Sequence, residues 1–99
     1  MLPSAEPSVI FQKVADGAVL FAPVSEIYFG LNDVGSRIWE MLPPVTGSLD
    51  ELCARIGADF PEVPPATIRT DIEELLSDLL REGLLVPHVA SSPVDVAAR

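Results

Sequence analysis

The chain has 99 residues, 48% of them hydrophobic, which suits one domain built around a single core. Fifteen acidic side chains against six lysines and arginines give a formal charge of −9. Because such an acidic surface repels the phosphates of nucleic acids and of anionic membranes, we expect neither as a partner. The single cysteine excludes an internal disulfide. With no signal peptide and no apolar run of membrane length, the sequence predicts a cytoplasmic protein.

The first third of the chain has the pattern of a three-stranded antiparallel meander. Residues 1–8 contain two prolines and no periodicity, and we expect a flexible arm there. Residues 9–14 and 18–22 are rich in β-branched and aromatic side chains, and the intervening Asp16-Gly17 favours a hairpin. A third strand is expected at residues 26–31, with a period of two. Its inner face would hold Ile27, Phe29 and Leu31.

After the third strand the period becomes helical. Asn32 is a suitable N-cap for a first helix, which Pro43-Pro44 would end. A capping-box pattern begins at Ser48 and opens a short second helix, which Gly57 is placed to end. The longest helix is expected over residues 65–82. Its apolar positions are Ile68, Ile72, Leu75, Leu76 and Leu79. The order predicts an α+β domain over residues 9–86, followed by a flexible tail at 87–99.

No group of side chains predicts catalysis. The one histidine, His88, falls in the expected tail, and Cys53 lies on an apolar stripe, where a small buried side chain is the usual finding. The carboxylates of the third helix have no neighbouring base or glycine-rich cradle and are typical of a solvated face. We therefore expect no catalytic residue, no metal site and no cofactor.

Two features favour a binding role. A three-stranded meander has free edges, and the third strand has one charge and no proline to block pairing. The apolar stripe of the third helix is also wider than one packing seam needs. For Ile72, Leu76 and Leu79 the core is the favoured interpretation, whereas Ile68 and Leu75 lie at the border of the stripe, where they could line a groove.

The run YFGLNDVGSRIWEML at residues 28–42 resembles the family of coenzyme PQQ synthesis protein D, in which Y-x-x-L-N leads into a helix with an Ile-Trp pair. The spaced Ile68, Asp71 and Ile72 and the later Gly83-Leu84-Leu85 are similar to the closing helix and end of that family. The resemblance covers residues 9–86. The sequence VGSRIW at residues 34–39 is most similar to the stand-alone members of this family that are found with lasso-peptide biosynthesis.

This resemblance implies a winged-helix-like domain that recognises the leader of a ribosomally made precursor peptide. The leader would add as an antiparallel strand to the third strand and pack against the third helix. It would then be presented to a maturation enzyme, either a leader peptidase or a radical S-adenosylmethionine enzyme. By position, one wall would be Glu26, Ile27, Tyr28 and Phe29, and the other Asp71, Ile72, Leu75 and Leu79. Two roles are open for the Asp71 carboxylate: contact with the ligand, or complementing the helix dipole.

Three alternatives remain open at this stage: a DNA-binding winged helix, an enzyme, and a structural subunit without a peptide ligand. A DNA-recognition helix should carry basic side chains. Residues 67–82 hold two arginines against five carboxylates, which disfavours DNA. The enzyme hypothesis is disfavoured because the sequence has no candidate pair of nucleophile and base. Titration with a leader peptide would distinguish a leader-binding protein from a structural subunit.

Overall fold

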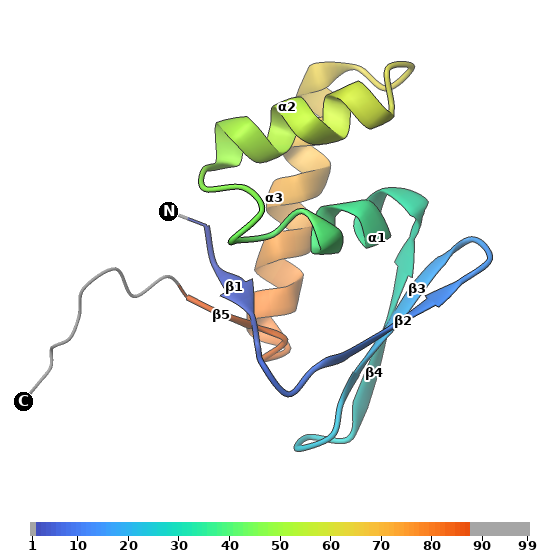
Figure 1. The fold of residues 1–99 in the computed structure, drawn as a ribbon, viewed down its shortest axis with the longest axis vertical. Helices are drawn as coiled ribbons and strands as arrows, with labels where there is room; N and C mark the ends of the chain where they lie inside the picture. The colour runs from blue at the N-terminus through green and yellow to red at the C-terminus, as the bar shows by residue number, and fades with distance from the viewer. Residues whose placement is uncertain (1, 88–99) are drawn as a thin grey trace, which may run out of the picture.

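The computed structural model describes residues 2–87, in which four strands come before three helices and a short fifth strand follows them (Figure 1). Three of the strands form an antiparallel sheet of order β2-β3-β4, which the helices follow along the chain. The predicted α+β architecture, a meander followed by three helices, is confirmed. A second, two-stranded sheet pairs the two ends of the domain. The bounds are β1 Ser4–Ala5, β2 Ile10–Val14, β3 Gly17–Ala22, β4 Ile27–Asn32, α1 Asp33–Glu40, α2 Leu49–Asp59, α3 Pro65–Arg81 and β5 Leu85–Val86.

The β2–β3 hairpin is closed by Val14 opposite Gly17, with two residues in the turn. Gly17 has φ +156°, and a Cβ there would come within 1.9 Å of the Leu31 carbonyl oxygen. Only glycine therefore allows β3 and β4 to approach at this point. In the middle strand, side chains alternate between a buried inner face and a half-exposed outer face, as a sheet covered on one side requires.

The first two helices begin where the sequence predicts. The Asn32 side chain accepts a hydrogen bond from the Gly35 N–H at 2.8 Å, and the Ser48 hydroxyl accepts one from the Glu51 N–H at 3.1 Å. The expected end of the second helix at Gly57 is wrong, because α2 continues to Asp59. A Cβ at Gly57 would lie 3.8 Å from the Ile68 side chain, an ordinary contact distance, so α2 passes beside α3 at this glycine.

The core lies where the inner face of the sheet meets the three helices. The large apolar side chains exposed by less than 2% come from the sheet, every helix and the segment after α3: Leu20, Ile38, Leu52, Ile56, Ile72, Leu79 and Leu84. Cys53 packs against the core as an apolar side chain, but it is only half-buried, less than expected, with its sulfur 3.9 Å from Arg69 Nη1. The cause is its position at the border of the α2 stripe.

The N-terminal segment is not the free arm that its prolines suggested. Strand β1 pairs antiparallel with β5, and the Glu6 N–H donates to the Leu84 carbonyl at 3.0 Å. Leu2 is 4% exposed and belongs to the core. Gly83, at φ +78°, turns the chain after α3, and β5 follows with a free edge. The N-terminal segment reaches this edge only when the domain is folded. His88 and the rest of the predicted tail beyond Pro87 lie outside the described residues.

We expect Leu2→Ala to lower the free energy of unfolding by about 2 kcal/mol or more, because it removes a buried leucine side chain. Urea denaturation followed by circular dichroism measures this loss. Val24→Ala is the matched control, since Val24 is 89% exposed and its truncation should leave stability unchanged. Equal stability of the two variants would mean that the N-terminal segment does not dock.

Candidate binding groove

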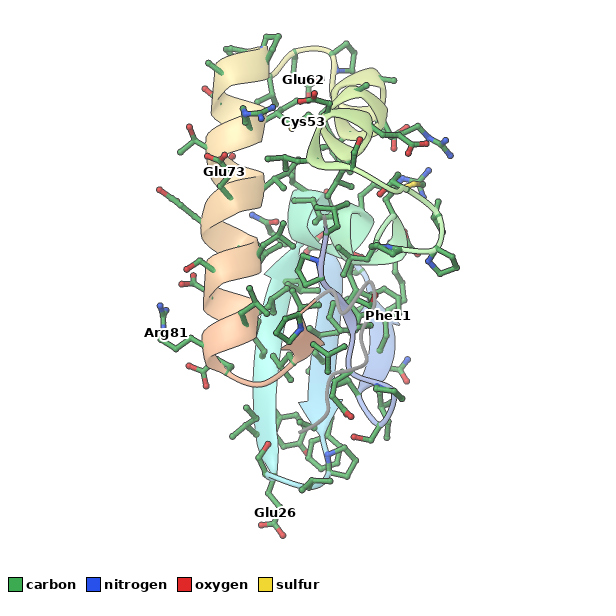
Figure 2. All side chains as sticks on the ribbon, turned by 90° about the vertical axis from the view of Figure 1, so that its left-hand side faces the viewer. Phe11, Glu26, Cys53, Glu62, Glu73 and Arg81 are labelled. Carbon is green, nitrogen blue, oxygen red and sulfur yellow. The ribbon has the colours of Figure 1, made fainter. Side chains whose placement is uncertain are left out.

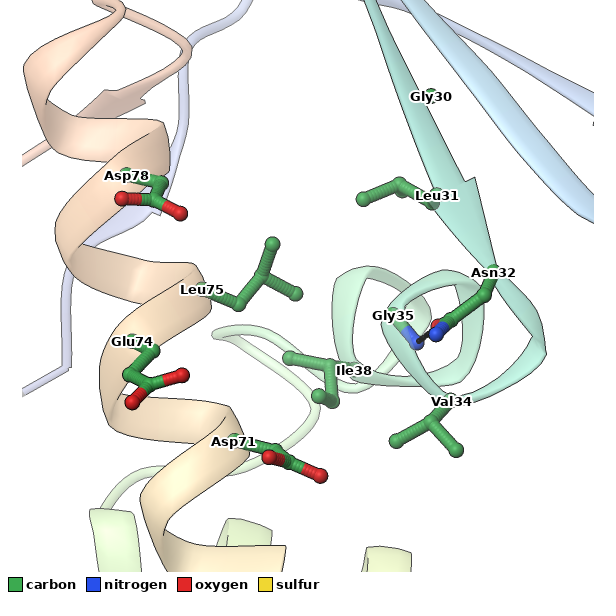
Figure 3. A pocket seen from close by; sticks show the side chains of 10 residues that line it. All are labelled: Gly30, Leu31, Asn32, Val34, Gly35, Ile38, Asp71, Glu74, Leu75 and Asp78. Carbon is green, nitrogen blue, oxygen red and sulfur yellow. Dashed lines mark hydrogen bonds between the residues drawn. The ribbon is translucent and has the colours of Figure 1, made fainter.

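A groove separates the free edge of β4 from α3, and the start of α1 closes one end (Figure 3). Its volume is about 320 Å³. The residues that line it come from β4, α1 and α3: Gly30, Leu31, Asn32, Val34, Gly35, Ile38, Asp71, Glu74, Leu75 and Asp78. We call this space the β4–α3 groove.

The strand side of the groove carries unpaired backbone groups. In an antiparallel pair, residues alternate between those that bond to the partner strand and those that point away. A two-residue hairpin closes with a bonded pair, here Val14 and Gly17, so the next pair outward, Ala18 with Leu31, is bonded across β3 and β4. The N–H groups of Tyr28, Gly30 and Asn32 therefore face the free edge.

The floor of the groove is apolar. Leu31 is 8% exposed and Ile38 is 1% exposed, and both belong to the core. Leu75 is half-buried and projects from α3 toward them, as Figure 3 shows. The prediction that Leu75 borders a groove is confirmed. An apolar side chain entering this space would gain contact with all three.

The helix side of the groove is acidic. Asp71, Glu74 and Asp78 line it, and no lysine or arginine does. Asp78 is engaged by Arg81 at 2.5 Å, whereas neither of the other two forms an ion pair within the described part of the chain. Asp71 also lies beyond the first turn of α3, outside the reach of the helix dipole. Its alternative role at the dipole is thereby excluded.

Glu26 does not belong to the paired edge that the sequence predicted. It has φ +60° and lies at the tip of the β3–β4 hairpin, far from the groove (Figure 2). Its N–H already donates to the Ala22 carbonyl at 2.7 Å. Ile27 and Phe29 lie in β4, but the register turns their backbone groups toward β3 and their side chains toward the core. Of the four predicted strand residues, Tyr28 alone presents free backbone groups at this edge.

The predicted helix wall is also narrower than expected. Ile68, Ile72 and Leu79 are 2%, 0% and 0% exposed, so they support the groove from within the core and do not line it. Ile68 faces α2, where it packs beside Gly57. Asp71 and Leu75 are the two predicted helix residues that the structure places on the groove.

Sequence reasoning missed four lining residues that matter here: Gly30, Asn32, Glu74 and Asp78. Gly30 and Asn32 follow from the alternation of backbone direction along β4. Which residues of β4 face the free edge, however, depends on the number of residues in the turn of the β2–β3 hairpin. Glu74 and Asp78 follow Asp71 at helical spacing, so they share its face. That spacing is the signal that could have found them.

Neither arginine of α3 lines the groove, and each pairs with a carboxylate. Arg69 binds Asp50 at 3.0 Å, a hydrogen bond that raises the pKa of its guanidinium, and Arg81 points outward beside Asp78 (Figure 2). This argues against α3 as a DNA-recognition helix. Among residues 2–87, no helix is long and apolar enough to cross a membrane, and no histidine, cysteine, aspartate and glutamate side chains gather as a metal site.

Comparison with known proteins agrees with this geometry. A solved structure described as "TbiB1 in Complex with the TbiA(beta) Leader Peptide" is similar, with 30% sequence identity and a TM-score of 0.72. The similarity covers 83% of this chain and 93% of TbiB1. No curated protein sequence gives a significant match. The profile of the family "Coenzyme PQQ synthesis protein D (PqqD)" matches residues 17–85, and the chain therefore belongs to that family.

Proposed function

We propose that this chain binds the leader segment of a ribosomally synthesised precursor peptide as an added antiparallel strand on β4. The observation that carries the proposal is the free edge of β4 opening onto the β4–α3 groove. TbiB1, which has the same fold, is described in complex with a leader peptide. The two together support a peptide guest in this groove.

The groove is suited to an extended guest. Backbone groups at Tyr28, Gly30 and Asn32 can pair with a strand of any sequence, which supplies affinity. Alternate side chains of the guest would point to the apolar floor at Leu31 and Leu75, which supplies selectivity.

The bound leader is presented to a maturation enzyme, and the chain itself is not a catalyst. A leader peptidase of the lasso-peptide type is the partner that we favour, with a radical S-adenosylmethionine enzyme as the alternative. The resemblance of the VGSRIW run to stand-alone versions supports this choice. The encounter would take place in the cytoplasm, where ribosomes release the precursor.

Titration of the ¹⁵N-labelled chain with the leader of a short precursor encoded beside its gene tests the proposal. We expect amide shifts at residues 28–32 and 71–78, with the N–H groups of Tyr28 and Gly30 gaining protection from exchange with solvent. Val24 and the α2 residues serve as internal controls, because they lie outside the groove. Absence of binding, or shifts confined to α2, would contradict leader capture on β4.

A further inference from the structure

Two carboxylates of α3 have cationic partners: Glu73 pairs with Arg69 at 3.8 Å, and Asp78, which lines the groove, pairs with Arg81 at 2.5 Å. Asp71 and Glu74 line the groove and have no cation within residues 2–87. They stand three positions apart on the helix, where like charges are neighbours and repel each other. A cation placed in the groove would relieve this repulsion.

We propose that the guest strand carries a lysine or arginine that sits against Asp71 and Glu74, two positions before an apolar residue that packs on Leu75. This inference rests on the proposed function and names the chemical class of leader that the groove selects. The occupant is a basic peptide segment, chosen by charge complementarity with a wall that has no basic residue.

The order and spacing of the two guest residues follow from the geometry. In Figure 3, Asp71 lies level with Val34 in the first turn of α1, just past the end of β4 at Asn32, and Asp78 lies toward the Gly30 end of the strand, so α3 runs opposite to β4. A guest antiparallel to β4 therefore runs in the same direction as α3, from Asp71 toward Asp78. Four residues of helix advance about 6 Å, and two residues of strand advance about 6.8 Å. Two consecutive inward-facing side chains of the guest, which are two positions apart, would therefore lie against Asp71 and Leu75.

Selection from a displayed library of random ten-residue peptides against the full chain tests this pattern. We expect enrichment of Lys or Arg two positions before Leu, Ile, Val or Phe. For one selected peptide, replacing the basic residue by methionine should weaken binding roughly three- to tenfold, the range for exposed ion pairs to two carboxylates. The loss should shrink as ionic strength rises.

The variant Asp71→Asn/Glu74→Gln should lose the basic preference and bind the lysine and methionine peptides equally. Glu62→Gln/Glu82→Gln is the matched control, since it removes the same charge at exposed positions that do not line the groove and should keep the preference. A basic preference that survives in Asp71→Asn/Glu74→Gln would overturn the inference and assign the preference to the overall negative charge.

The outcome also separates this inference from the proposed function. Peptides that shift the amides of residues 28–32 but show no basic preference would overturn the inference alone and leave strand addition intact. A library that gives no binder at the β4 edge would overturn both. Enrichment of the basic–x–apolar pattern that depends on Asp71 and Glu74 supports both.

Discussion

Tyr28→Pro is expected to weaken leader binding at least tenfold while the domain stays folded. Proline removes the N–H that faces the free edge of β4, and its ring occupies the place of the guest backbone. A lost hydrogen bond of about 1 kcal/mol, together with the steric clash, accounts for a change of this size. Isothermal titration calorimetry with the leader measures the affinity, and circular dichroism reports on the fold.

Tyr28→Ala is the matched control for this variant. The Tyr28 ring stacks on Phe21 with centroids 4.6 Å apart, and both substitutions remove that contact. Alanine keeps the backbone donor, so its binding should stay close to that of the parent. Equal affinities of the proline and alanine variants, both folded, would refute pairing through the Tyr28 backbone.

Ile72→Ala is expected to cost about 2–5 kcal/mol of unfolding free energy, because Ile72 is 0% exposed and its truncation leaves a cavity. The folded fraction should bind the leader with unchanged affinity, since the side chain does not line the groove. Urea denaturation measures the first effect, and titration well below the unfolding midpoint measures the second.

Leu75→Ala provides the contrasting case one turn further along α3. Leu75 is half-buried and lines the groove, so its truncation should cost less stability than Ile72→Ala. It should weaken leader binding roughly fivefold or more, because the guest loses an apolar contact. If Ile72→Ala weakened binding more than Leu75→Ala in folded protein, our assignment of core and wall would be reversed.

Much of the fold could be predicted from local patterns. The Asp16-Gly17 hairpin, the caps at Asn32 and Ser48 and the proline at the start of α3 each act within a few residues, so sequence alone locates them. The docked N-terminus could not be found in this way. Its partner strand, β5, lies some eighty residues further along the chain, and no local period marks such a pairing.

The candidate site was predicted less well, for a related reason. Sequence pattern indicated a free third strand and an apolar helix, and the strand, Leu75 and Asp71 do meet at the groove. Local sequence does not separate Glu26 from the strand, because a glutamate next to an apolar run has no distinct signal, but its positive φ puts it in the turn. Whether Ile68, Ile72 and Leu79 line the groove or lie in the core depends on which face of α3 packs on the other elements, and the sequence does not give that orientation.

The sequence by itself determined the strand that offers a free edge: its β-forming side chains, its lack of proline and the negative charge around it. Only the tertiary structure decided which backbone groups of that strand are free and which carboxylates stand opposite them. Hydrogen-bond direction alternates residue by residue along a strand, and its phase is set by a turn in another hairpin. The wall opposite comes from a helix whose orientation is set by core packing, through long-range contacts that no short segment encodes.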